Sequence, residues 1–372
     1  MQFIDLNTQQ KRIRNKLEKR IEEVLNHGKY IMGPEVFELE DQLAEYVGVK
    51  NCITCSSGTD ALLIPLLAKN IGPGDAIITT PFTYIATAEV IALVGATPIF
   101  VDIYPETFNM DPANIKNAIQ EAKNKGLNPK AIIPVDLFGL PARYRMIEEI
   151  AKENNLFILE DAAQGFGGSI RKKRAGSFGD VASTSFFPAK PLGCYGDGGA
   201  IFTNDDNLAD LMRSIRVHGG GVDKYDNVRI GINGRLDTLQ AAVLLEKLSI
   251  FREDEIKLRN DVADYFKTNL KDKYQLPFIP KNYESSWAQF SLVASSKLER
   301  ESVMKKLRDK KIPSMIYYRI PLHLQKVFKN LNYVEGDFPV SEKIADQVFS
   351  IPMHPYLLKH QQDEIIEVLN NA

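Results

Sequence analysis

The sequence predicts an α/β protein with a mostly parallel central sheet and a smaller α+β domain at its C-terminal end. Between about residues 52 and 203, short apolar, β-branched segments alternate with amphipathic helical segments, which is the order of βαβ units. Several of the short segments are apolar throughout, as strands are when helices cover both faces of a parallel sheet. After about residue 250 this alternation ends, which indicates a second domain.

The first 50 residues carry the apolar spacing of amphipathic helices, which we expect over residues 11–25 and 34–47. In the alternating region, the predicted helices include residues 84–94 and 141–154. The β-branched segments predict strands at residues 76–80, 98–102, 131–137, 156–160, 181–186 and 200–203.

The chain is predicted to divide into a large domain, residues 1–250, and a small domain, residues 251–372. A long helix over residues 239–259 would lead from one to the other. Beyond it, the pattern predicts a strand, a helix and a strand, at residues 286–295, 297–310 and 313–318. This mixed order is typical of an α+β unit that packs beside a larger domain.

Composition restricts the classes of partner. The 372 residues include 46 basic and 48 acidic ones, so no overall positive field favours nucleic acid or an anionic membrane. There is no apolar run of about 18 residues, and the first residues lack the pattern of a signal peptide. Three cysteines cannot form a disulfide framework and suit a reducing compartment. We therefore expect a cytoplasmic protein that binds neither nucleic acid nor membrane.

Cys52 and Cys55 have the C-x-x-C spacing of some metal and redox sites. They lie in a β-prone segment, however, and residues three apart on a strand face opposite sides. A zinc site would need two further ligands, and Cys194 is the only other thiol. We interpret both cysteines as core residues and expect no metal site.

A small-residue segment, Ser56-Ser57-Gly58-Thr59, follows the β-prone segment that contains Cys52 and Cys55 and leads into a helix. Gly58 would let the backbone approach a ligand closely, and Thr59 would add a hydroxyl group. The unpaired amides and the dipole at a helix N-terminus favour a phosphate group. Ser and Thr also cap helices that bind no ligand, so this segment alone leaves both functions open.

Charged residues follow two later strands of the sheet. Glu160 and Asp161 come directly after the apolar residues 156–159, where a carboxylate could contact a ligand or cap the next helix. Lys190 lies between Pro188 and Pro191 among mainly apolar and small residues. Loss of hydration there would lower the pKa of the amine and make it available for a Schiff base, although a surface lysine in a loop is the alternative.

A fourth segment, residues 231–242, places Asn233 and Arg235 just before an amphipathic helix. Arg235 could bind a phosphate or carboxylate through two parallel hydrogen bonds, or form a structural ion pair. Ligands of open α/β sheets bind beyond the carboxyl ends of the strands, so we expect these segments to lie close together. Together they supply what a pyridoxal-phosphate (PLP) enzyme requires: a lysine for the aldehyde, a carboxylate for the ring nitrogen and donors for the phosphate.

With these motifs, the sequence resembles the DegT/DnrJ/EryC1/StrS sugar aminotransferases. These are PLP-dependent transferases of fold type I, which is the aspartate-aminotransferase fold. The likeness extends over nearly the whole chain, from residues 28–36 to residues 351–356. Its most specific string is residues 185–199, Ser-Phe-Phe-Pro-Ala-Lys-Pro-Leu-Gly-Cys-Tyr-Gly-Asp-Gly-Gly.

The resemblance implies roles for residues at the family's motif positions. Lys190 would form the Schiff base with PLP, and Asp161 would pair with the ring nitrogen. The other implied cofactor contacts are Gly58, Thr59 and Ser185 at the phosphate, Tyr84 stacked on the ring, Gln164 near the phenolic oxygen, and Asn233 at the phosphate of the other subunit's cofactor. These roles make the active site a property of a homodimer.

The residues implied to contact the substrate are Gly28, Tyr30, Arg235, Tyr317 and Tyr318. Within the family, the chain is most similar to enzymes that aminate C3 of a UDP-linked 3-keto-hexuronic acid for surface polysaccharide, with L-glutamate as the expected amino donor. Residues 316–319 differ from the pattern of those enzymes. Amination of another nucleotide-linked 3- or 4-keto sugar is therefore an alternative, and non-catalytic binding of a nucleotide sugar is a second. His218 and His323 are the histidines that we expect nearest the site, and a catalytic and a structural role are both open for each.

Overall fold

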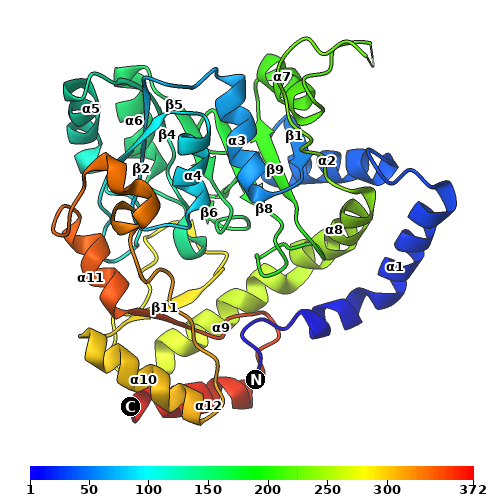
Figure 1. Ribbon diagram of the computed structural model, residues 1–372. Helices are drawn as coiled ribbons and strands as arrows, with labels where there is room; N and C mark the ends of the chain where they lie inside the picture. The colour runs from blue at the N-terminus through cyan, green and yellow to red at the C-terminus, as the bar shows by residue number, and fades with distance from the viewer. Residues whose placement is uncertain (224) are drawn as a thin grey trace.

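A seven-stranded sheet forms the centre of the protein (Figure 1). The computed structural model describes residues 1–223 and 225–372. In spatial order the strands are β1 (Asn51–Cys55), β9 (Gly199–Thr203), β8 (Val181–Ser185), β5 (Phe157–Asp161), β4 (Asn128–Ile132), β2 (Asp75–Thr79) and β3 (Thr97–Phe100). Strands β8 to β3 run parallel, and β9 is antiparallel to both of its neighbours. The prediction of a mostly parallel α/β sheet is therefore confirmed.

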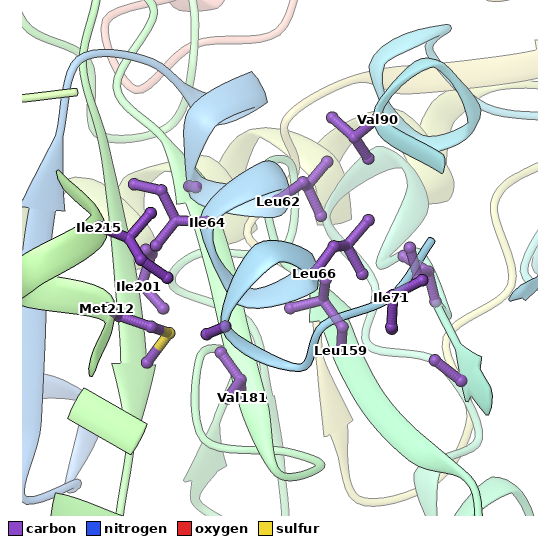
Figure 2. Close-up of a cluster of buried hydrophobic side chains, with 14 of the residues drawn as sticks. Leu62, Ile64, Leu66, Ile71, Val90, Leu159, Val181, Ile201, Met212 and Ile215 are labelled. Carbon is purple, nitrogen blue, oxygen red and sulfur yellow. The ribbon is translucent and has the colours of Figure 1, made fainter. Parts of the chain in front are cut away.

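Helices cover both faces of this sheet, as expected for strands that are apolar throughout (Figure 1). One face packs against α3 (Gly58–Ala68), α4 (Ala86–Leu93) and α7 (Asp206–Arg216). The other face packs against α2 (Pro34–Val47), α5 (Ile115–Asn124), α6 (Tyr144–Asn154) and α8 (Thr238–Ile250). Figure 2 shows the first of these cores, where Leu62, Leu66 and Val181 lie between α3 and the sheet.

Strand β1 contributes side chains to both cores. Cys52 belongs to the core beneath α2 and α8, whereas Cys55 belongs to the core beneath α3 and α7. The two thiols therefore face opposite sides of the sheet and are buried, as the strand period predicts. Burial raises the pKa of both thiols.

A long helix lies along one edge of the molecule. It is α1 (Leu6–His27), capped by Asp5, whose carboxylate accepts from Thr8 N at 2.9 Å, and it packs along α8. Helix α8 continues through a π-helical turn (Phe251–Glu255) into α9 (Ile256–Asn269). The domain boundary expected at residue 250 thus falls inside one continuous helical segment. No described helix is both long enough and apolar enough to cross a membrane.

The C-terminal part has a sheet and a core of its own. Strands β11 (Phe290–Val293) and β12 (Val348–Ile351) pair antiparallel, and their core includes side chains from α9, α10 (Lys297–Asp309) and α12 (Lys359–Asn370). The remaining elements are the strands β6 (Ser169–Ile170), β7 (Lys173–Arg174) and β10 (Tyr283–Glu284), the helix α11 (Pro339–Gln347), and the 3-10 helices η1 (Pro112–Asn114), η2 (Leu137–Gly139), η4 (Leu322–Leu324) and η5 (Lys326–Leu331).

Two strand predictions differ most from the structure. The strand expected at residues 313–318 is wrong, because only Met315 pairs, in an isolated bridge with Ser350. The next residues turn away to pack against the core that contains Phe82. The strand expected at residues 131–137 begins earlier and ends at Ile132.

Candidate active site

The N-terminus of α3 and the end of β8 meet to form a small cradle. Ser57 caps the helix, since its Oγ accepts a backbone hydrogen bond at 3.0 Å. Ala61 N makes the first backbone hydrogen bond of the helix. The amides of Gly58 and Thr59 come before it and have no acceptor within the helix. A methyl group on Gly58 would lie 2.6 Å from Ser185 Cβ, so glycine is what allows β8 to approach this closely. Gly58, Thr59 and Ser185 therefore surround a helix terminus suited to an anion.

Lys190 lies in the loop that follows β8. Its backbone amide donates to Phe187 O at 2.9 Å, which fixes a turn at this point. Within the described part of the chain, its amine has neither a hydrogen bond nor an ion pair. Burial lowers the pKa of Lys190, and the charge of Asp161 opposes that shift. The sequence placed these two residues in separate motifs, and the structure brings them into electrostatic contact.

Asp161 ends β5 and is 5% exposed. Its carboxylate accepts hydrogen bonds from Thr87 Oγ1 at 2.8 Å and from Ala163 N at 3.2 Å. Burial raises the pKa of Asp161, while the two donors and the Lys190 ammonium lower it. The arrangement holds one buried carboxylate in a fixed orientation beside a single cationic group.

Gln164 connects the strand ends to the segment that carries the two tyrosines. Its Oε1 accepts from Phe138 N at 2.9 Å, and its Nε2 donates to Tyr318 Oη at 3.1 Å. The Tyr318 ring lies 6.4 Å from the Tyr84 ring, and Tyr84 is 57% exposed. Tyr317 packs edge-on against Phe3. Tyr84 is thus open to a ligand on one side and backed by Tyr318 on the other.

Asn233 and Arg235 line an open hollow together with Ile31, Ser56 and Gln240. The hollow adjoins the phosphate cradle, because Ser56 N donates to Gly234 O at 3.0 Å. Asn233 is exposed, and the buried Arg235 Nε has no hydrogen-bond acceptor among the described residues. The arginine therefore has donor capacity left for a ligand.

Gly28 and Tyr30 lie on the same side of the molecule as Arg235. Gly28 ends α1 with φ of 67°, a left-handed conformation that favours glycine. Tyr30 O then accepts from Thr238 N at 2.9 Å, which fixes this segment beside Arg235. The predicted substrate residues therefore form two groups, one around Arg235 and one at Tyr317 and Tyr318.

The profile of the DegT/DnrJ/EryC1/StrS aminotransferase family matches residues 11–370. The chain belongs to this family. It is 49% identical over 358 residues, 96% of each chain, to the UDP-2-acetamido-2-deoxy-3-oxo-D-glucuronate aminotransferase of Pseudomonas aeruginosa. A family member from Brucella abortus has a similar crystal structure, with a TM-score of 0.97, 52% identity and coverage of 100% of this chain and 99% of that one. NtdA from Bacillus subtilis, solved with bound PMP, has a TM-score of 0.89, 31% identity and coverage of 99% and 82%.

The residues of this DegT-family site fit PLP. Burial lowers the pKa of Lys190, which favours the neutral amine that a Schiff base requires. Asp161 would supply a buried carboxylate for a protonated ring nitrogen, and a side chain on Gly58 would fill the cradle at the start of α3. The aldehyde, the ring nitrogen and the phosphate of the cofactor would thus each meet a group of suitable chemistry.

Sequence reasoning missed Thr87, which donates to Asp161 from helix α4. Thr87 lies 74 residues away from Asp161 in the chain. It occurs in an apolar helix, where no local sequence pattern indicates a residue of the site. Its burial, at 1% exposed, is the feature that would have singled it out, and only the structure provides it.

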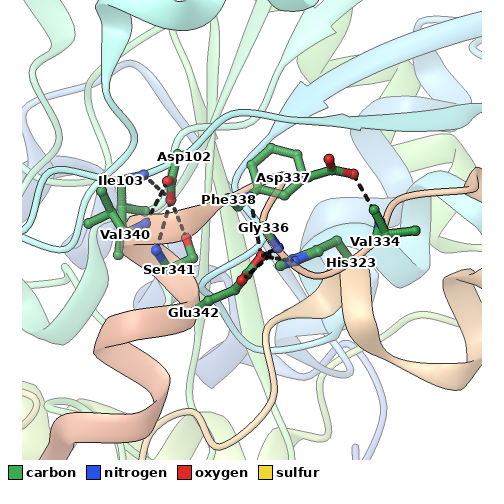
Figure 3. A network of polar contacts seen from close by, with 10 residues as sticks. All are labelled: Asp102, Ile103, His323, Val334, Gly336, Asp337, Phe338, Val340, Ser341 and Glu342. Atoms are coloured by element: carbon green, nitrogen blue, oxygen red, sulfur yellow. Dashed lines mark hydrogen bonds and ion pairs between the residues drawn. The ribbon is translucent and has the colours of Figure 1, made fainter. Parts of the chain in front are cut away.

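The two histidines expected near the site have other contacts. His323 is buried, and its Nε2 lies 3.0 Å from the Glu342 carboxylate, which also accepts from the Gly336 amide (Figure 3). In the same view, Asp102 caps α11 by accepting from Val340 N and Ser341 N at 2.9 Å. His218 is exposed, and its amide donates to Ile232 O. The structure therefore gives His323 a role in fixing α11.

Proposed function

We propose that this protein uses PLP to transfer an amino group from L-glutamate to C3 of UDP-2-acetamido-2-deoxy-3-oxo-D-glucuronate, for surface polysaccharide. The sugar assignment is supported by the 49% identity to the Pseudomonas aeruginosa aminotransferase named for it. The single observation that carries the chemistry is the electrostatic interaction between Lys190 and the buried Asp161, near a helix terminus suited to an anion.

Lys190 is the proton carrier in this proposal. When bound, PLP would supply the carrier for the amino group and the electron sink for the carbon that loses a proton. Lys190 Nζ takes this proton and returns it, because desolvation leaves a larger fraction of the amine neutral. Among the described residues, Asp161 is the carboxylate whose charge acts on this amine.

The other roles follow from position. Asp161 would keep the ring nitrogen protonated, and its two hydrogen-bond donors favour its ionised form against the effect of burial. Gly58, Thr59 and Ser185 would bind the phosphate. Tyr84 would stack on the ring, and Gln164, whose amide is oriented by Phe138 N, would lie near the phenolic oxygen. Nucleotide-sugar binding is assigned to Gly28, Tyr30, Arg235, Tyr317 and Tyr318.

We also propose a cytoplasmic homodimer in which Asn233 reaches the phosphate of the partner's cofactor. Asn233 and the neighbouring Ile31 and Ile230 project to the surface, the isoleucines being 48% and 91% exposed. Exposed apolar side chains around a polar hollow are typical of an interface. A partner subunit would cover them and bring Asn233 to a second active site.

The test is the sugar half-reaction run in reverse under single-turnover conditions. UDP-3-amino and UDP-4-amino sugars, each with and without a C6 carboxylate, are added to the PLP-loaded enzyme while the visible absorbance of the Lys190 Schiff base is recorded. Loss of absorbance with the 3-amino uronic acid alone supports the full assignment. Loss with a 4-amino sugar alone contradicts the assigned sugar and retains the chemistry. If no amino sugar and no L-glutamate changes the absorbance, the protein is a non-catalytic binder.

A further inference from the structure

Behind Asp161 lies a pair of buried carboxyl groups, Asp136 and Glu160, both 0% exposed. Glu160 precedes Asp161 in β5, so its side chain points to the opposite face of the strand. Asp136 follows the neighbouring strand, and its amide donates to Asp161 O at 3.0 Å. The pair is therefore attached by backbone to the residue that would face the cofactor.

Four hydrogen-bond donors surround this pair. Asp136 Oδ1 accepts from Ala142 N at 2.9 Å and from Tyr144 Oη at 2.8 Å. The two Glu160 oxygens accept from Gly176 N and Phe178 N, each at 2.7 Å. Asp136 Oδ2 is buried and lacks a donor among the described residues, although the two side chains lie within hydrogen-bonding reach of each other.

No lysine or arginine within the described ranges forms an ion pair with either carboxyl group. Burial raises the pKa of both groups. The Asp136 charge raises the pKa of Glu160 further, whereas a hydrogen bond from Glu160 lowers the pKa of Asp136. The other titratable groups that face the pair are Tyr144 from α6, Tyr283 from β10 and Asp161. None of these is cationic, so two adjacent buried negative charges would be uncompensated.

We propose that Asp136 and Glu160 hold a single proton between them, and that this proton fixes the charge behind Asp161. A proton on Glu160 would donate to Asp136 Oδ2 and would satisfy the one acceptor that lacks a partner. The four donors then stabilise the single remaining negative charge. Both residues act through Asp161, so they are positioning residues, and this part of the inference rests on the proposed function.

Substituting the amides Asn and Gln for Asp136 and Glu160 removes charge while keeping the shape of the side chains. Asp136→Asn keeps an oxygen for Ala142 N and Tyr144 Oη and provides an N–H for Glu160, so the pair keeps one negative charge and needs no proton. Asp136→Asn/Glu160→Gln leaves the pair with no charge. Asp180→Asn is the matched control, because Asp180 is an exposed carboxylate that accepts from Ile158 N on the same strand.

The first readout is the infrared carbonyl band of a protonated carboxyl group, recorded on the cofactor-free protein at pH 7. We expect this band in the unaltered protein and in Asp180→Asn, and its loss in Asp136→Asn. In Tyr144→Phe one donor to the anion is removed, so the band should persist to higher pH. Absence of the band from the unaltered protein, or its retention in Asp136→Asn, overturns the shared proton.

The second readout is the pH midpoint of the Lys190 Schiff base, followed by visible absorbance of the PLP-loaded protein. Relative to Asp136→Asn, the double variant should lower this midpoint by roughly one pH unit, the size expected for one charge about 10 Å away at an effective dielectric constant of about 20. An unchanged midpoint overturns the link to Asp161. If the unaltered protein forms no Schiff base, the proposed function fails, and the infrared band still decides whether the pair holds a proton.

Discussion

Thr87 and Asp161 are joined by a hydrogen bond of 2.8 Å between the hydroxyl group of α4 and the carboxylate at the end of β5. Both residues are buried, at 1% and 5% exposed, so water does not replace this donor easily. The bond lowers the pKa of Asp161 against the effect of burial. It therefore helps to keep Asp161 ionised in a site that disfavours charge.

Thr87→Val should lower kcat/KM by about tenfold, since a hydrogen bond to a charged group is worth about 1.5–3 kcal/mol. Without the donor, the pKa of Asp161 rises, so the carboxyl group becomes neutral at a higher pH. The acidic limb of the pH–rate profile should therefore move to higher pH. Thr87→Ser keeps the hydroxyl group and should keep the profile. An unshifted acidic limb in Thr87→Val would contradict this role.

Lys190→Ala should abolish turnover while leaving the fold intact, because the lysine is the only amine electrostatically coupled to Asp161 among the described groups. The measurement is steady-state activity together with the melting temperature and the visible Schiff base absorbance. Lys172→Ala, at an exposed lysine, is the control and should change none of the three. Substantial transamination by Lys190→Ala would refute the assignment.

Gly58→Ala should weaken cofactor binding more than it weakens the fold. Its methyl group would lie 2.6 Å from Ser185 Cβ and 2.9 Å from its Oγ, so α3 and β8 must separate at the proposed phosphate site. Overpacking of this kind costs about 1–3 kcal/mol. We expect the dissociation constant of PLP to rise at least tenfold by equilibrium titration.

A second substitution tests the cause of that loss. Ser185→Gly removes the clashing side chain together with one phosphate contact. If the clash is the cause, Gly58→Ala should lower affinity much less in the Ser185→Gly background than in the unaltered protein. Equal losses in both backgrounds would mean that Gly58→Ala acts elsewhere.

The general architecture and the order of the cofactor residues could be predicted because each is tied to a local pattern. Asp161 ends β5 and Lys190 lies in the loop after β8, and strand ends converge at one edge of a parallel sheet. The predicted cofactor set is incomplete where contacts join distant segments: Thr87, Asp136 and Glu160 are ordinary residues until the fold buries them together.

The C-terminal part was less predictable for a related reason. Strand β12 is a four-residue segment that follows α11 directly, and its apolar residues suit a helix end as well as a strand. Residues 313–318 have the composition of a strand. Their Tyr317 and Tyr318 side chains instead pack against the core that contains Phe82. Tertiary contacts thus decided between two conformations that local composition allows.

His354 should make the protein sensitive to acid. Burial lowers its pKa to about 4, with Arg259 adding to this shift and Asp5 opposing it. Above about pH 6.5, His354 is neutral in both folded and unfolded chains, and its contribution to stability is complete. As the pH falls from 6.5 towards 4, the unfolded chain takes up the proton first, so the folded state loses up to about 3 kcal/mol.

The corresponding variant is His354→Gln, which removes this titration. Its free energy of unfolding, measured by denaturant titration at several pH values, should fall less steeply between pH 6.5 and 4 than that of the unaltered protein. His360→Gln alters an exposed histidine and should leave the slope unchanged. Parallel slopes for His354→Gln and the unaltered protein would exclude this source of acid sensitivity.

Mixed dimers distinguish a shared active site from an independent one. Lys190→Ala removes the amine, and Asn233→Ala removes the exposed amide at the rim of the hollow. If Asn233 serves the partner's cofactor, a hybrid of the two variants contains one site with both residues intact. After unfolding and refolding of an equimolar mixture, half of the dimers are hybrids, so about a quarter of the original activity should return. If Asn233 serves its own subunit, every hybrid site lacks one of the two residues, and activity should stay at the average of the two parent variants.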